Sequence, residues 1–337
     1  MPIYLVTGGA GFIGSSLAET LLESGETVRI LDNFSTGRWS NIQSLRGKLE
    51  VIEGDITDPE VVSRVMRDVE IVFHEAAIPS VARSIANPQA TLHCSVQGTA
   101  VVLDGARHAN VRRVIFAASS SAYGNTPLLP KVETMNAVPL SPYAVAKLTG
   151  EHLLRVYSSL YGIETLSLRY FNVFGPRQDP KSEYAAVIPK FIEAAIHGEK
   201  PTVYGDGEQT RDFCFIANTI NANLLAAGSS TRLSGEVVNI ACGDRVSLNT
   251  LLDFIGEEAI AAGVAHRGKK IEALYAPSRP GDVRDSLADI SAAKRLIGYE
   301  TRVRLREGLK LTMKALIAAR TSDADPNGRR FDYTVGA

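Results

Sequence analysis

Hydrophobic and polar positions follow two alternating patterns along the first half of the chain. Short apolar runs rich in β-branched residues predict strands at residues 3–7, 27–32, 49–55, 70–77, 112–120 and 164–171. Segments with apolar residues at helical spacing predict helices between them, at 12–24, 59–67, 88–109 and 142–161. Continuously apolar strands separated by amphipathic helices are typical of a parallel sheet that is covered on both faces. We therefore expect a doubly wound α/β fold.

The pattern is looser in the second half, where the glycine- and proline-rich segments "FGPRQDP", "VYGDGEQT" and "PSRPGD" separate isolated helices and short strands. We expect residues 1–172 to form one domain, with 212–241 returning to it. Residues 173–211 and 242–320 are expected to form a smaller, mixed α/β C-terminal domain, followed by a mobile polar tail at 321–337. Loops at the carboxyl ends of a parallel sheet commonly bind the substrate, so the smaller domain is the expected substrate domain.

Composition narrows the class of ligand. The chain has 36 basic and 37 acidic residues, so it offers no net field that would attract nucleic acid or an anionic membrane. Its three cysteines are widely spaced and fit neither a disulfide framework nor a zinc site, and the histidines are scattered, so we expect no metal. No signal peptide and no run of about 18 apolar residues is recognisable. These features predict a cytoplasmic protein that acts on a small molecule.

A glycine-rich turn follows the first predicted strand in "LVTGGAGFIGSS". Gly9, Gly11 and Gly14 have the spacing G-x-G-x-x-G, and Gly8 precedes them. Glycines in this position let the backbone turn tightly and approach a pyrophosphate, whose charge then lies at the N-terminus of the following helix. The order of strand, turn and helix predicts a dinucleotide-binding domain of the Rossmann type.

Acidic residues at the ends of the next two strands indicate which dinucleotide binds. Asp32 follows Gly14 by 18 residues, where a carboxylate can accept hydrogen bonds from the adenosine ribose and would repel a 2′-phosphate. This position favours NAD over NADP, although Arg38 could favour the phosphorylated cofactor. Asp55 either contacts the adenine amino group or caps a helix.

Several further motifs occur in order: "GDITD", "HEAA", "SSSAYG", "SPYAVAK", "RYFNVFGPRQ", "RDF" and "RPGDV". With the glycine turn, they make residues 1–318 resemble the extended short-chain dehydrogenase/reductase family, and within it the NAD-dependent 4-epimerases of UDP-glucose and UDP-N-acetylglucosamine. The resemblance implies a cofactor that stays bound through turnover and a reaction through a 4-keto sugar. It also implies a homodimer formed by the helices at 88–109 and 142–161.

The catalytic group implied by the resemblance is Ser119, Tyr143 and Lys147. Physical reasoning agrees, because Ser141 is a good helix N-cap and Pro142 suits the first helical position, which places the tyrosine and lysine one turn apart on one helix face. An ammonium about 4 Å from the phenolate contributes about 4 kcal/mol at an effective dielectric constant of 20. We therefore expect Lys147 to lower the pKa of Tyr143 towards neutrality, so that the tyrosine accepts the proton of the sugar 4-hydroxyl.

The resemblance assigns other residues to the two ligands. The expected cofactor-binding residues are Gly8, Gly11, Phe12, Ile13, Gly14, Asp32, Asn33, Ser35, Thr36, Gly37, Asp55, Ile56, Ala76, Ala77, Tyr143, Lys147, Tyr170 and Val173. The expected substrate-binding residues are Ser80, Ser120, Ser121, Asn172, Ala186, Val187, Tyr204, Arg211, Arg279, Asp282 and Ser286. Among these, the arginines suit a diphosphate because a guanidinium can bind two phosphate oxygens at once.

The identity of the sugar depends mainly on Ser286. In the family a tyrosine at this position restricts the pocket to unacetylated sugars, so the small serine predicts UDP-GlcNAc and UDP-GalNAc as substrates, with UDP-Glc and UDP-Gal as weaker ones. A UDP-glucuronate 4-epimerase or decarboxylase stays open as an alternative. Ser120 and Ser121 argue against a 4,6-dehydratase, which needs acidic residues there. A non-catalytic nucleotide sensor is the alternative from another class.

Overall fold

A computed structural model of the chain describes residues 2–179, 186–264, 271–278 and 283–322. Its centre is a seven-stranded sheet in the order β11-β6-β5-β4-β1-β2-β3, in which all neighbouring strands are parallel. The strands are β1 (Ile3–Thr7), β2 (Thr27–Asp32), β3 (Lys48–Glu53), β4 (Val69–His74), β5 (Arg113–Ser119), β6 (Glu164–Tyr170) and β11 (Ser234–Ile240). The doubly wound parallel sheet expected from the sequence is confirmed.

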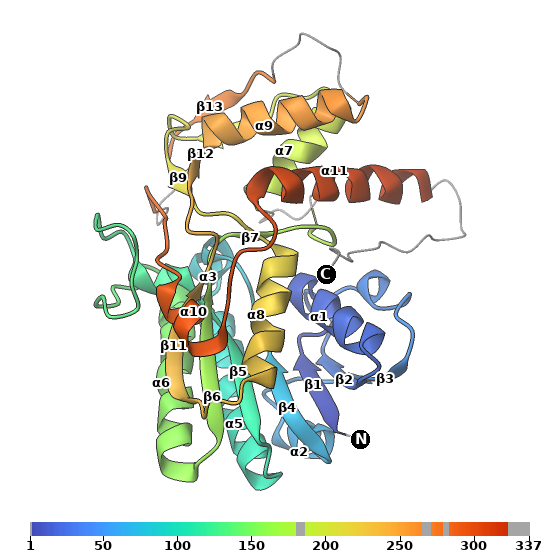
Figure 1. Cartoon of the computed structure of the whole chain (residues 1–337), viewed down its shortest axis with the longest axis vertical. Helices are drawn as coiled ribbons and strands as arrows, with labels where there is room; N and C mark the ends of the chain where they lie inside the picture. The colour runs from blue at the N-terminus through green and yellow to red at the C-terminus, as the bar shows by residue number, and fades with distance from the viewer. Residues whose placement is uncertain (1, 180–185, 265–270, 279–282, 323–337) are drawn as a thin grey trace.

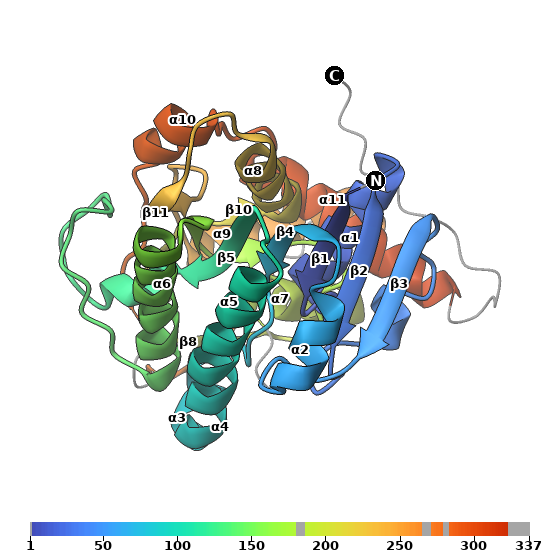
Figure 2. The ribbon, with the colours of Figure 1, turned by 90° about the horizontal axis from the view of Figure 1, so that it is seen from below.

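Helices cover both faces of the sheet, as the continuously apolar strands require (Figure 2). One face carries α1 (Phe12–Glu23), α8 (Ile216–Gly228) and α10 (Ser291–Ile297), and the other carries α2 (Pro59–Val65), α5 (Gly98–His108) and α6 (Pro142–Tyr161). Separate hydrophobic clusters fill the two interfaces: Leu17 and Leu166 belong to one, and Leu103 and Leu154 to the other. The sheet is thus the middle of three layers.

One predicted helix differs from the structure. Residues 88–109 are divided into α4 (Pro88–Leu92), a π-helical segment His93–Gln97 and α5. The hydroxyl of Thr99, in the first turn of α5, donates to the carbonyl of Ser95 in the π-helical segment at 2.6 Å. A π-segment places one extra residue in a helical turn, which hydrophobic periodicity cannot reveal. Such segments are frequent at functional sites, and this one places Cys94 beside the cavity described below.

A second group of elements lies above the carboxyl ends of the strands (Figure 1). It contains three two-stranded ladders and three larger helices. The ladders pair β7 (Val173–Phe174) with β10 (Cys214–Phe215), β9 (Thr210–Arg211) with β12 (Val246–Ser247), and β8 (Thr202–Tyr204) with β13 (Leu274–Ala276). The helices are α7 (Val187–His197), α9 (Leu248–Ala261) and α11 (Leu305–Ser322), and α3 (Val81–Ala86) lies nearer the sheet.

One hydrophobic cluster joins this second group to the sheet. It runs from Ile30 and Leu168 in the sheet through Ile220 of α8 to Leu251 of α9 and Met313 of α11. Because buried apolar area is the main stabilising contribution to folding, a shared cluster fixes the second group against the ends of the strands. Helix α11 extends to Ser322 and so includes the first two residues of the predicted tail, whose other residues, 323–337, lie outside the described part of the chain.

The strand order produces a crevice at one point. The chain proceeds outward from β1 to β2 and β3, and then returns so that β4 lies on the other side of β1. At such a switch point, the connections after two adjacent parallel strands leave in opposite directions, and ligands bind between them. Within the parts of the chain described, no helix has the length and apolar character needed to cross a membrane.

Candidate active site

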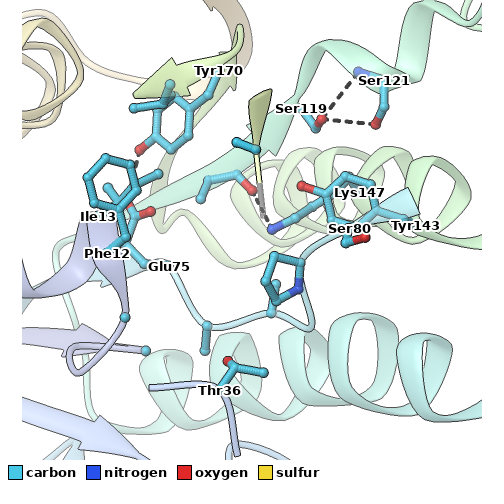
Figure 3. A pocket seen from close by; sticks show the side chains of 18 of the residues that line it. Phe12, Ile13, Thr36, Glu75, Ser80, Ser119, Ser121, Tyr143, Lys147 and Tyr170 are labelled. Carbon is cyan, nitrogen blue, oxygen red and sulfur yellow. Dashed lines mark hydrogen bonds between the residues drawn. The ribbon is translucent and has the colours of Figure 1, made fainter. Parts of the chain in front are cut away.

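A cavity of about 710 Å³ opens at this crevice. Its walls come from the turn after β1, the carboxyl ends of β2, β4, β5 and β6, the start of α6, and loops of the second group. Figure 3 shows a close view in which Phe12, Ile13 and Thr36 lie with Tyr143 and Lys147 around the same space. The cavity therefore brings together the predicted cofactor and catalytic residues, from segments far apart in the sequence.

The glycine turn has the geometry that close approach of a dinucleotide requires. Gly8 has a φ of +69°, and a Cβ on it would lie 2.7 Å from the Cα of Ala76. A Cβ on Gly14 would collide with the carbonyl group of Gly8. Gly11 is the N-cap of α1, and the first turn of this helix has no acidic residue. The helix N-terminus is thus open to the negative charge of a pyrophosphate.

Asp32 is held in position at the end of β2. Its carboxylate accepts hydrogen bonds from the backbone N–H groups of Ala10 and Phe34, both at 2.8 Å. Burial raises the pKa of this carboxyl, and the two backbone donors oppose that rise. Arg38, which could have favoured a 2′-phosphate, contacts Asp179 at 3.3 Å instead. The carboxylate and the open helix terminus fit NAD, as the sequence predicts.

Two predicted cofactor residues support the site without lining the cavity. Asp55 accepts hydrogen bonds from both the backbone and the hydroxyl of Thr57, at 2.8 and 2.7 Å, and one from Asn33 at 2.7 Å. Asp58, not Asp55, caps α2. Gly37 packs against the Asp32 carboxylate, since a Cβ there would lie 2.8 Å from both of its oxygens. These residues therefore fix the shape of the two loops beside the cavity.

Apart from Asp55 and Gly37, the predicted site residues either line the cavity, do not line it, or lie outside the described part of the chain. The cavity is lined by Gly8, Gly11, Phe12, Ile13, Gly14, Asp32, Asn33, Ser35, Thr36, Ile56, Ala76, Ala77, Ser80, Ser119, Ser120, Ser121, Tyr143, Lys147, Tyr170, Asn172, Val173, Ala186, Arg211 and Ser286. Val187 and Tyr204 are not among the lining residues. Arg279 and Asp282 lie outside the described residues.

Tyr143 and Lys147 are positioned by the start of α6. The Ser141 hydroxyl accepts a hydrogen bond from the Ala144 N–H at 3.2 Å, and Pro142 occupies the first turn, as the sequence predicts. Lys147 is only 3 % exposed, and its Nζ donates to the Ala117 carbonyl at the end of β5, at 2.6 Å. This bond links the helix to the central sheet and holds the ammonium at the cavity wall.

The predicted pKa of Tyr143 is wrong in direction. Burial raises the pKa of this tyrosine, an interaction with the Ser119 hydroxyl lowers it in part, and the Glu75 carboxylate raises it further. The expectation assumed that the Lys147 ammonium points at the phenolate and that desolvation is a smaller effect. Burial instead lowers the pKa of Lys147 to about 8. Removal of the phenolate from water is therefore the dominant effect on the pKa of Tyr143.

Ser119 lies at the end of β5, at the start of a 3-10 turn over Ser120–Tyr123. Its Oγ accepts hydrogen bonds from the Ser121 hydroxyl at 2.9 Å and the Ser121 N–H at 3.2 Å, as Figure 3 shows. A hydroxyl that already accepts two bonds has its own proton free to donate. Ser119 can thus donate towards an oxygen that lies beside Tyr143.

A buried ion pair connects α6 to the sheet one turn beyond Lys147. Arg169 of β6 binds Glu151 of α6 through two hydrogen bonds of 2.7 Å, and both side chains are almost fully buried. The guanidinium also lies 4.6 Å from the ring centre of Tyr123, whose hydroxyl donates to Asn239 at 2.7 Å. The network fixes the helix that carries the catalytic pair, since the geometry of a bidentate pair is strict.

Sequence reasoning missed several residues of the cavity wall. Glu75, Arg83, Lys131, Arg177 and Asp179 all line it. Glu75 could have been found, because it directly follows the fourth strand at the switch point. Arg177 and Asp179 lie in a loop that contacts the first domain. These contacts join residues more than a hundred positions apart in the sequence, such as Arg38, which donates to the Arg177 carbonyl. In the described part of the chain, no cluster of three or more histidine, cysteine or acidic side chains could hold a metal.

Comparison with known proteins identifies the family. The model of the NAD dependent epimerase/dehydratase family matches residues 4–241, which is most of the chain. The chain belongs to this family. A curated relative, the putative UDP-glucose 4-epimerase of Methanocaldococcus jannaschii, is 40% identical over 308 residues, which is 91% of this chain and 95% of that protein.

Solved structures of other family members superpose closely on the chain. The UDP-N-acetylglucosamine 4-epimerase of Methanobrevibacter ruminantium M1, in complex with UDP-N-acetylmuramic acid, is 37% identical with a TM-score of 0.86. The UDP-glucuronic acid 4-epimerase of Bacillus cereus, in complex with UDP-glucuronic acid and NAD, is 33% identical with a TM-score of 0.85. Both alignments cover 94% of this chain and 99% of the other. The family, the Rossmann fold and the NAD dependence are therefore established, whereas the three relatives differ in their sugar.

Proposed function

We propose that this epimerase interconverts UDP-GlcNAc and UDP-GalNAc, with weaker activity on UDP-Glc and UDP-Gal. Its reaction inverts the configuration at C4 of the sugar. The proposal combines a catalytic group of the family type, a cavity of about 710 Å³ lined by the residues expected to bind cofactor and substrate, and a small side chain at Ser286. That last observation carries the choice of sugar.

The residues of the cavity suit proton transfer at the sugar 4-hydroxyl. Tyr143 accepts the hydroxyl proton, and Ser119 donates a hydrogen bond to the same oxygen, which orients it and disperses its charge. Lys147 carries a positive charge at the same cavity wall, where it can stabilise the anion that proton transfer leaves. NAD, held by the glycine turn and Asp32, would supply the acceptor and donor of hydride for C4 of the sugar. Tyr143 then gives the proton back, so the reaction has no net redox change.

Residues of the second group suit the nucleotide part of the substrate. Arg211 of β9 and Asn172, which follows β6, both line the cavity. Asn172 has a φ of +32°, which is rare for a residue other than glycine. Its side-chain amide donates to the Asp212 carbonyl at 2.9 Å. Strain of this kind often marks a residue that must face a ligand. We infer that the second group is the UDP-sugar domain. It differs from the predicted residues 173–211 and 242–320 because it also contains β10, whereas α10 covers the sheet.

Ser286 supports a pocket that admits an N-acetyl group. It is 9% exposed, lines the cavity, and lies within 3.5 Å of the Asn172 amide. Its backbone N–H donates to the Thr210 carbonyl at 3.1 Å, so the position is fixed to the strand beside Arg211. A larger side chain there would extend into the cavity. The small serine leaves that space for the substituent at C2 of the sugar.

The variant Ser286→Tyr tests this assignment. We expect its kcat/KM for UDP-GlcNAc to fall about a hundredfold, while kcat/KM for UDP-Glc changes less than about threefold, because only the acetylated sugar needs the filled space. Ser286→Ala is the matched control and should retain both activities. Equal loss of both activities in the tyrosine variant would contradict the assignment of Ser286, although it would leave the epimerase chemistry intact.

A uronate substrate is the outcome that would replace this proposal. A UDP-glucuronate 4-epimerase would convert UDP-GlcA into UDP-GalA, and a decarboxylase would release carbon dioxide. We expect neither product at a rate above about one hundredth of the UDP-GlcNAc rate. Measurement of all three products from one enzyme preparation separates these functions.

The surface of α6 supports the expected homodimer. Val145, Val156 and Leu160 are 42%, 47% and 68% exposed, and their spacing of eleven and four residues places them on one face of the helix. Arg107 of α5 lies over the ring of Tyr161 at 4.0 Å, so the ends of the two helices form one continuous surface. Apolar stripes of this kind are typical of interfaces. We propose that two copies pair through α5 and α6.

A further inference from the structure

Glu75 is a carboxylate in the cavity for which the proposed mechanism has no use. It directly follows β4, and its backbone N–H donates to the Thr7 carbonyl at 3.2 Å, which fixes it beside the glycine turn. Its side chain is half-buried and forms part of the cavity wall. An ionised group in such a place costs free energy unless other groups stabilise it.

Two other elements hold the Glu75 side chain. The hydroxyl of Tyr170, at the end of β6, donates to Glu75 Oε1 at 2.8 Å. That hydroxyl accepts in turn from the amide of Asn223 on α8, also at 2.8 Å. The carboxylate is therefore bound directly to β6 and, through the Tyr170 hydroxyl, to α8. Figure 3 draws Glu75 and Tyr170 on the wall of the cavity that also contains Tyr143 and Lys147.

The charge of Glu75 acts on both members of the catalytic pair. It raises the pKa of Tyr143 and opposes the fall in the pKa of Lys147. Lys147 in turn opposes the effect of burial on Glu75, whose pKa is raised to about 7. Among the other titratable groups, Cys94 also acts on Lys147 from the π-segment, and His74 is neutral because burial lowers its pKa to about 3.

We propose that Glu75 is a positioning residue that sets the pH range of catalysis, because its Tyr170-bound carboxylate controls the charges of Tyr143 and Lys147. This inference rests on the proposed function only for its effect on the pH profile of kcat/KM. Glu75 does not need to touch the substrate. It acts through the two residues that accept the proton and stabilise the resulting anion.

The direction of the effect follows from the charges. A negative Glu75 disfavours the Tyr143 phenolate and favours the Lys147 ammonium. Removal of that charge therefore lets Tyr143 lose its proton at lower pH, and lets Lys147 lose its proton at lower pH as well. Since activity requires the phenolate with the ammonium beside it, both limbs of the pH profile move towards acid.

The variant Glu75→Gln tests the proposal, because glutamine retains the size of the side chain and an oxygen that accepts from Tyr170. We expect both limbs of kcat/KM to move about one pH unit towards acid, with KM at the optimum changed less than about twofold. Glu133→Gln is the matched control. Glu133 is a partly buried carboxylate that accepts a hydrogen bond from the Asn239 N–H, and it does not act on Tyr143. The pH profile of Glu133→Gln should therefore equal that of the wild type.

A second readout does not depend on activity. The phenolate of Tyr143 is followed by ultraviolet absorbance during a pH titration of the NAD-loaded protein, as the difference from Tyr143→Phe. We expect its midpoint to fall by the same amount in Glu75→Gln. If the protein proves not to be an epimerase, this titration still tests Glu75, so the two failures are distinguishable.

Unchanged limbs and an unchanged Tyr143 midpoint in a folded Glu75→Gln protein would overturn the proposal. If that variant fails to fold, Glu75→Ala replaces it, since it removes the same negative charge with a smaller side chain. The Tyr143 midpoint should then also move towards acid. A Glu75→Ala midpoint equal to that of the wild type would overturn the proposal equally.

Discussion

Individual residues of the site differ in how well the sequence predicts them. The glycine turn, Asp32 and the helix cap at Ser141 are local features, and their geometry follows from a few neighbouring residues. The pKa of Tyr143 does not follow from neighbouring residues, because it also depends on Glu75, which lies 68 residues earlier in the chain. Lys147 likewise finds its acceptor, the Ala117 carbonyl, 30 residues away. Motif spacing can name the catalytic residues but cannot give their charges.

In the proposed mechanism, catalysis depends most on Tyr143. We expect Tyr143→Phe to lower kcat about a thousandfold, because general base catalysis typically contributes between about 10² and 10⁴. The bound NAD per protein should stay the same, since the ring and the helix are retained. Tyr275→Phe is the matched control, because Tyr275 is 59% exposed and binds Asn249 outside the cavity. Activity of Tyr143→Phe within tenfold of the wild type would contradict the assigned base.

Lys147 should give the wild-type pH profile a break near pH 8. Its pKa is lowered to about 8, mainly by burial, so its ammonium is present below that pH and is lost as the pH rises through it. The pKa of Tyr143 is raised above its usual value, so the phenolate fraction still increases with pH in this range. Because the two changes oppose each other, we expect kcat/KM to rise with pH up to about 8 and to level off above it, measured at constant ionic strength. Replacement of Lys147 by Met should remove the break together with most of the activity, and a wild-type profile that rises through pH 8 without a break would contradict the role of the ammonium.

At the scale of elements, the sequence predicts the sheet and most of its helices because each strand and helix has its own hydrophobic pattern. It does not predict the contacts between loops. Arg177 donates to Glu19 of α1 at 2.7 Å, with side chains only 12% and 17% exposed, and Arg38 contacts Asp179. These two ion pairs cross from the loop after β7 to the first domain, beside the residues expected to bind the adenosine of NAD.

These two ion pairs, which cross from the loop after β7 to the first domain, should contribute to retention of the cofactor. We expect Arg177→Ala to raise the dissociation constant of NAD about tenfold, because a hydrogen-bonded and largely buried ion pair is lost. The NAD that stays bound after gel filtration is the measurement. Arg306→Ala is the control, since it removes an exposed ion pair to Glu257 far from the cavity. Equal NAD retention in the two variants would show that the crossing has no such role.

At the scale of the whole molecule, the parallel sheet and its switch point place the cofactor and substrate residues at one end of the strands. The sequence predicts this arrangement because it depends on the order of strands and helices. The second group is harder to predict, since its strands are only two or three residues long and pair with distant segments. Its shared hydrophobic cluster with the sheet arises from the tertiary fold alone.

The proposed dimer is also a property of the whole molecule. We expect Leu160→Asp to convert the dimer into a monomer, because a carboxylate in an apolar interface has no partner to replace its water. Sedimentation at micromolar concentration measures the mass. Leu274→Asp is the control, since Leu274 is 55% exposed on β13, away from α5 and α6. A wild type that sediments as a monomer would contradict the proposed pairing.

The most direct test of the account is the conversion of UDP-GlcNAc by the purified protein without added NAD. The account predicts that UDP-GalNAc forms, and that the same equilibrium mixture is reached when the reaction starts from UDP-GalNAc. That result would establish both inversion at C4 and a cofactor that stays bound. If neither sugar nucleotide is converted while the protein contains bound NAD, the central claim is wrong.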